Sequence, residues 1–60
     1  MRLQRWRRER GLTQAELAKK AGVTELYISQ LETGLRENPS PSVLRRLAKA
    51  LGVSAGELLD

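Results

Sequence analysis

The 60-residue chain contains no cysteine and no histidine, which excludes disulfide bonds, zinc fingers, thiol nucleophiles and imidazole bases. A domain of this size buries only about 60% of its unfolded surface, so it holds one small core and a two-lobed enzyme is excluded. Eleven Lys and Arg residues against seven Asp and Glu give a net charge of +4, which favours an anionic partner, while no apolar run approaches the roughly 20 residues that a membrane span needs.

Apolar residues recur at helical spacing almost throughout the chain, and no segment alternates with the period of two that is typical of a strand. Leu3 and Trp6 mark the inner face of a first helix, which Gly11 ends. We expect Trp6 to be a core aromatic residue at a leucine-like position. The surrounding arginines leave one alternative, in which this helix lies on an anionic membrane surface.

The second helix is predicted to begin at a capping box. Thr13 can accept a hydrogen bond from the amide of Glu16, whose carboxylate can reach back to the Thr13 amide. Leu12 and Leu17 flank this box as a hydrophobic staple. Three signals therefore coincide at one helix start.

The third helix is predicted over about residues 24–33, with Thr24 as its N-cap and Gly34 as the residue that ends it. Only Ala21-Gly22-Val23 separates it from the second helix. A connection this short, with a glycine free to adopt a left-handed conformation, forces the two helices to cross steeply.

A fourth helix is predicted to begin near Ser40-Pro41, because proline at the first helical position loses no hydrogen bond, and to end at Gly52. Ser54 and Glu57 repeat the capping-box pattern for a fifth helix. No linker interrupts the chain, so residues 1–60 are predicted to form a single domain. The buried stripe of the fourth helix is expected to consist of Leu44, Leu47, Ala48 and Leu51.

The outward face of the third helix differs from an ordinary solvated surface. Ile28 and Leu31, together with Thr24, are expected to point toward the core. The opposite side lacks the Lys–Glu pairs of a solubilising face and carries an amide, hydroxyls, a carboxylate and methyl groups, all of which can read base edges in DNA. These outward residues are Glu25, Leu26, Tyr27, Ser29, Gln30 and Thr33.

Residues 12–34, LTQAELAKKAGVTELYISQLETG, resemble the helix-turn-helix of the phage-repressor (Cro/Xre-like) DNA-binding family. The match includes Gln14 at the start of the motif, Ala18 beneath the helix crossing and Gly22 in the turn, and the RRERG segment and the LRRLAKALGVS tail extend it over essentially the whole chain. The resemblance implies an all-α fold, a compact five-helix bundle, and sequence-specific binding of double-stranded DNA by a transcriptional repressor.

The family pattern also implies roles for individual positions. Gln14 would hold a phosphate at a helix N-terminus and buttress Glu25. Arg7 would pair with Glu32 and tie the first helix to the third, although ordinary surface charge is the alternative for both. The positions that match the major-groove face are Glu25, Leu26, Ser29 and Gln30. Contacts to the DNA backbone are expected from Gln14, Thr24, Tyr27, Thr33 and Arg36.

The chemistry of the expected base-reading residues suggests what each would recognise. Glu25 can accept a hydrogen bond from cytosine N4, Leu26 can pack on a thymine methyl group, and Gln30 can bond adenine through two hydrogen bonds. Glu25 and Leu26 replace the glutamine-rich start of some family members. The site sequence of a known repressor therefore does not transfer to this chain.

Functions other than DNA binding have less support in the sequence. The sequence offers no base–nucleophile pair, so we expect no enzyme activity, no cofactor and no metal site. The main alternative is an antitoxin-like interaction module that masks a partner protein, and a weaker one is an anionic-membrane binder. A DNA-binding role implies a cytoplasmic location with the bacterial or phage nucleoid.

The oligomeric state is a separate expectation. Family members commonly bind palindromes as two-fold dimers. Leu35 and Leu59 are the apolar residues that the core needs least, with Val43 as another possibility, so Leu35 and Leu59 are the candidates for a small self-contact. We expect a monomer in solution that pairs, if at all, as a weak homodimer on DNA.

Overall fold

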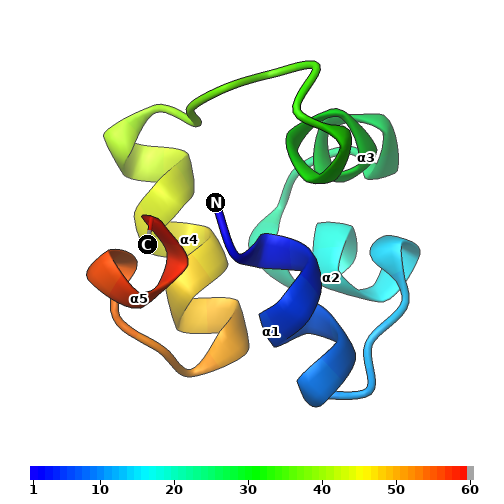
Figure 1. Ribbon diagram of the computed structural model, residues 1–60. Helices are drawn as coiled ribbons and strands as arrows, with labels where there is room; N and C mark the ends of the chain where they lie inside the picture. The colour runs from blue at the N-terminus through cyan, green and yellow to red at the C-terminus, as the bar shows by residue number, and fades with distance from the viewer. Residues whose placement is uncertain (60) are drawn as a thin grey trace.

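The computed structural model describes residues 1–59, and within that range the chain forms five α-helices and no strand (Figure 1). This confirms the predicted all-α five-helix bundle. α3 and the α4–α5 pair lie on opposite sides of the molecule, and the chain that leaves α3 crosses between them (Figure 1). The helices are α1 (Leu3–Glu9), α2 (Gln14–Ala21), α3 (Glu25–Thr33), α4 (Pro41–Leu51) and α5 (Ala55–Leu59).

Side-chain caps set the helix starts where the sequence predicts them. The hydroxyl of Thr13 accepts from the amide of Glu16 at 3.0 Å, and the Glu16 carboxylate accepts from the amide of Thr13 at 2.8 Å, which completes the capping box of α2. The hydroxyls of Thr24, Ser40 and Ser54 each accept from the amide three residues further on, at 3.1, 3.3 and 3.2 Å. Local chemistry therefore accounts for the starts of four helices.

The turn between α2 and α3 depends on a left-handed glycine. Gly22 has φ 70° and ψ 36°, a conformation that disfavours residues with a Cβ atom. The amide of Val23 then donates to the carbonyl of Ala18 at 3.0 Å, which closes the end of α2. The chain can therefore reverse over three residues and lay α3 across α2, with which it packs closely.

The core takes at least one fully buried aliphatic side chain from each helix, and this is what fixes α3 against the rest of the molecule. α2 packs against both α3 and α4, while α1 supports α3 and α5 packs on α4. Small side chains at Ala18 and Ala21 let the neighbouring helices approach α2 closely. The buried core residues are Leu3, Leu17, Ala18, Ala21, Ile28, Leu31, Leu47, Ala48, Leu51 and Leu58, and Pro39 in the loop before α4 is also buried.

Two expectations about the core need correction. Trp6 is only half-buried: its indole Nε1 donates to the backbone carbonyl of Glu57 at 3.3 Å, and the Arg10 guanidinium lies 5.3 Å from the ring centroid. An indole has a polar N–H group, so a position at the rim of the core satisfies it better than a fully apolar one. Leu44 is also half-buried and packs at the margin of the core.

None of the helices within residues 1–59 is long and apolar enough to cross a membrane.

Candidate nucleic-acid interface

The outer side of α3 presents a continuous set of accessible side chains. Ile28 and Leu31 are buried, so they anchor the helix and turn its opposite side to solvent. Glu25 is exposed and Leu26 is 66% exposed, while Ser29 and Gln30 are half-buried at the flank. The four residues predicted to read bases thus share one accessible side of α3. Thr33 is exposed at its last turn.

The N-terminal end of α3 differs from the sequence expectation at one point. Helical spacing predicts that Thr24 faces the core, but its side chain is exposed and its hydroxyl caps the helix. A capping hydroxyl must turn toward the free amides of the first turn, so it cannot also enter the core. This places Thr24 at the edge of the accessible face, where the amides of the first turn also lie.

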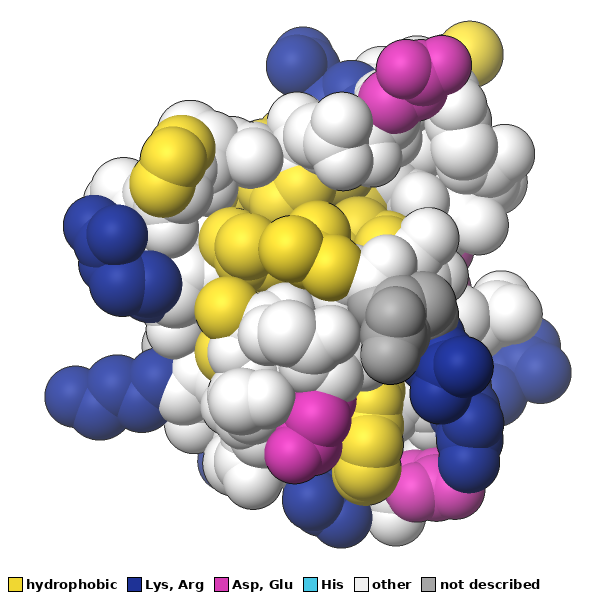
Figure 2. Space-filling view, turned by 60° about the vertical axis from the view of Figure 1, so that its left-hand side comes forward, with side chains coloured by type: hydrophobic (Ala, Val, Ile, Leu, Met, Phe, Trp, Pro, Cys, Tyr) yellow, Lys and Arg dark blue, Asp and Glu magenta, His cyan; other side chains and the backbone are white. Residues whose placement is uncertain are grey.

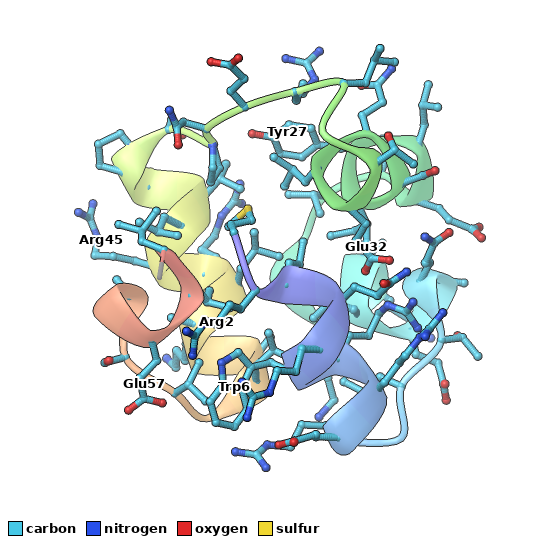
Figure 3. All side chains as sticks on the ribbon, viewed as in Figure 1. Arg2, Trp6, Tyr27, Glu32, Arg45 and Glu57 are labelled. Carbon is cyan, nitrogen blue, oxygen red and sulfur yellow. The ribbon has the colours of Figure 1, made fainter. Side chains whose placement is uncertain are left out.

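A shallow, open hollow of about 440 Å³ lies beside this face. Its apolar wall includes Val23 and Leu26, and its polar rim includes Gln30 and Arg36. Tyr27 lies on the side of α3 that faces the loop leading to α4 (Figure 3). The residues that line the hollow are Val23, Thr24, Leu26, Tyr27, Gln30 and Arg36.

Arg36 is held against α3 by three contacts. Its Nε donates to Oε1 of Gln30 at 3.0 Å, and its backbone amide donates to the Gln30 carbonyl, also at 3.0 Å. Its guanidinium lies 5.1 Å from the centroid of the Tyr27 ring, within the range of a cation–π contact. The sequence pattern identified these three residues as separate DNA contacts and gave no indication of this link, because Arg36 lies beyond the helix, in an irregular loop.

Gln14 occupies the first position of α2, but its side chain does not buttress Glu25 as the resemblance implied. Its Nε2 donates instead to Oε1 of Glu32 at 3.1 Å. The Glu32 side chain is 1% exposed and needs protein donors, whereas Glu25 is exposed and its carboxylate is open to solvent. Gln14 therefore connects the start of α2 to the last turn of α3.

Arg7 and Glu32 form the ion pair that supports this arrangement. Arg7 donates from Nε to Oε2 of Glu32 at 2.6 Å and from a terminal nitrogen to Oε1 at 3.0 Å. A further Arg7 nitrogen donates to the carbonyl of Leu12 at 2.7 Å. In Figure 3 Glu32 points from α3 toward the interior side occupied by α1 and α2. The pair thus holds the last turn of α3 against α1 and against the segment that leads into α2.

The protonation of this pair follows from its surroundings. Burial opposes ionisation of Glu32, but hydrogen bonds from Arg7, Gln14 and Gln4 and the positive charge of Arg7 outweigh it, so the pKa of Glu32 is lowered. The hydrogen bond to Glu32 raises the pKa of Arg7, against the opposing effect of burial. Both partners are therefore charged at neutral pH.

Comparison with known proteins identifies the class. A family model described as helix-turn-helix matches residues 3–58, and the chain belongs to this family, in its Cro/Xre-like branch. The HTH-type transcriptional regulator SinR of Bacillus subtilis is 42% identical over 59 residues, which cover 98% of this chain and 53% of SinR. The immunity repressor protein of Bacillus phage phi105 is 40% identical over 58 residues, covering 97% of this chain and 40% of the repressor.

A solved structure provides the corresponding comparison in three dimensions. The crystal structure of SinR, the master regulator for biofilm formation, in complex with DNA superposes with a TM-score of 0.94 at 42% identity. The match covers 98% of this chain and 94% of that one. The chain spans about half the length of SinR.

Proposed function

We propose that this chain binds double-stranded DNA in a sequence-specific manner, with α3 in the major groove. Residues 1–60 form one domain, which acts as the DNA-binding domain of a transcriptional regulator. The observation that carries the proposal is the accessible face of α3, held by a buried ion pair on a fold that superposes on SinR in its complex with DNA. The major groove of B-DNA is wide enough to admit one α-helix. A role on the chromosome places the protein in the cytoplasm with the nucleoid.

Within this proposal, the side chains divide into two groups. Glu25, Leu26, Ser29 and Gln30 read base edges, because they share the exposed side of α3 and carry donors, acceptors and a methyl-packing surface. Contacts to the phosphates position the duplex but carry no sequence information. The residues we assign to these backbone contacts are Gln14, Thr24, Tyr27, Thr33 and Arg36.

Selection from a random duplex library tests the proposal directly. We expect the purified chain to enrich one sequence motif. Its affinity should fall steeply as salt rises, because the Lys and Arg side chains release condensed counterions from DNA when the protein binds. Enrichment of no motif would overturn the proposal. Association with anionic phospholipid vesicles without any preference among duplexes would support the membrane alternative instead.

A matched pair of leucine variants locates the reading face. Leu26→Ala removes an exposed leucine from α3, and Leu59→Ala removes one from α5, which lies on the other side of the molecule (Figure 1). On a single half-site, Leu26→Ala should relax the preference at one base pair, whereas Leu59→Ala should leave every preference unchanged. Equal effects of the two variants would show that α3 is not the reading helix.

A further inference from the structure

The contact between Arg36 and Gln30 determines which way the side-chain amide of Gln30 is oriented on the recognition face. The Arg36 Nε and the Gln30 Oε1 lie 3.0 Å apart. A guanidinium has donors and no acceptor, so the atom of the Gln30 amide that faces Arg36 must be its oxygen. The orientation of this amide is therefore fixed by chemistry, since a flipped amide would place two donors against each other.

The rest of the Gln30 amide follows from its planar geometry. Oxygen and nitrogen branch from the same terminal carbon in one plane, so with Oε1 against Arg36 the Nε2 group lies on the other branch, away from the guanidinium. Within residues 1–59 this Nε2 group donates to no protein atom. Gln30 thus presents its two amide hydrogens at the free end of the side chain.

Arg36 is restrained well enough to impose this orientation. Its backbone amide is bonded to the Gln30 carbonyl, and its guanidinium rests over Tyr27, so both ends of the residue are held by α3. The resulting hydrogen bond is charge-assisted and stronger than one between neutral groups. Rotating the Gln30 amide by half a turn would break it and bring donors together.

We propose that Arg36 is a positioning residue that presents Gln30 to DNA as a hydrogen-bond donor, so that the base read by Gln30 is guanine. Guanine offers two adjacent acceptors, N7 and O6, at its major-groove edge, whereas adenine offers N7 beside the N6 donor. Reading adenine through two bonds needs the Gln30 oxygen to accept from the N6 amino group, but Arg36 already occupies one lone pair of that oxygen, and its positive charge disfavours a second donor there. The inference rests on the proposed function and replaces the adenine preference expected for an unrestrained glutamine.

The test compares two variants that lose the same charge. Arg36→Met removes the donor that holds Gln30 and keeps an unbranched side chain. Arg45→Met makes the same change on α4, where Arg45 points to solvent far from α3 (Figure 3). Gln30→Ala identifies the base pair concerned, as the position whose preference disappears in the selected motif. Competition among four duplexes that differ only at that pair then gives a ratio that general electrostatic attraction does not affect.

We expect the unmodified chain and Arg45→Met to favour guanine over adenine by roughly tenfold, the size of one good base contact. Arg36→Met should reduce this ratio to near one or reverse it in favour of adenine. In the Gln30→Ala background, Arg36→Met should not change the ratio further. A preference for adenine in the unmodified chain, or an unchanged guanine preference in Arg36→Met, would overturn the inference while leaving DNA binding intact. Failure to select any motif would instead overturn the proposed function.

Discussion

Arg7 on α1 and Glu32 on α3 are joined by two hydrogen bonds, 2.6 and 3.0 Å long, although 25 residues separate them in the chain. Their side chains are 10% and 1% exposed, so neither charge is compensated by bulk water. Gln14 adds a third bond to the same carboxylate from the first turn of α2. The buried Glu32 carboxylate thus connects α1, α2 and α3 at the last turn of α3, the proposed recognition helix.

Removal of the Glu32 carboxylate should strongly destabilise the fold. Glu32→Ala leaves Arg7 buried without its partner, and breaking such a pair typically costs about 3–5 kcal/mol in the free energy of unfolding. The exposed pair between Arg5 and Glu9, with its atoms 3.8 Å apart, offers a control: Glu9→Ala should cost about 0–1 kcal/mol. Urea unfolding measures both. A double-mutant cycle with Arg7→Ala that shows no coupling would contradict the buried pairing.

Acid should weaken the fold through the same carboxylate. The pKa of Glu32 is lower in the folded chain than in the unfolded one, so the ionised pair contributes its full stability above the ordinary glutamate pKa of about 4.3. That contribution is lost as the pH falls through the lowered pKa. Glu32→Gln should therefore flatten the decline of the urea midpoint below about pH 4.3. The result would be at odds with this account if the acid limbs of the two proteins had the same slope.

Glu16 supplies a second, weaker source of acid sensitivity that the Glu32→Gln variant should retain. Hydrogen bonds with the backbone and side chain of Thr13 lower the pKa of Glu16. This carboxylate is exposed, so its contribution is screened by solvent.

Gln14→Ala should separate a phosphate contact from a base contact. If Gln14 holds a phosphate, the variant weakens the specific duplex and a random duplex by similar factors, because phosphate contacts position the protein without specifying sequence. The variant also loses a hydrogen bond to Glu32, which should lower the free energy of unfolding by about 1.5–3 kcal/mol. Binding is therefore measured under conditions in which both proteins are folded. Unchanged affinity for both duplexes would remove Gln14 from the interface.

The free chain should be monomeric at micromolar concentration. Leu35 is 77% and Leu59 is 50% exposed, whereas Val43 is half-buried and already packs on the core. Figure 2 shows an apolar area on the side of the molecule that carries α4 and α5, ringed by polar and charged side chains. Obligate dimers usually bury more than about 2,000 Å², which a patch on a domain this small does not provide. Sedimentation of the free protein checks this, and a tight dimer would refute it.

Pairing on DNA is tested separately. Two copies on a palindrome would place their α3 helices about 34–36 Å apart, one turn of the duplex, so that both meet the same side. Affinity per site should then be higher on paired half-sites than on a single one. Equal affinity per site would mean that the domain binds alone.

Local sequence signals are sufficient to predict the helices and their order. Capping residues, left-handed glycines and apolar spacing act over three or four residues, so Thr13, Gly22 and Ser40 predict their local structures without knowledge of the rest. The same periodicity separated buried Ile28 and Leu31 from the exposed side of α3. The pairing of Arg7 with Glu32 was accessible only through the resemblance to a family, because nothing local links these positions.

The hydrogen-bond partners of the polar side chains, by contrast, follow only from the way the helices pack together. Gln14 bonds Glu32 because α3 brings a buried carboxylate to the start of α2, and Trp6 lies at the rim because α5 offers its indole a carbonyl. Arg36 bonds Gln30 because the loop after α3 folds back along the helix. Such bonds depend on the relative placement of helices and on side-chain rotamers, which helical periodicity does not encode. For this reason the sequence could name the residues on the recognition face but could not say which of their donors and acceptors are free to meet DNA.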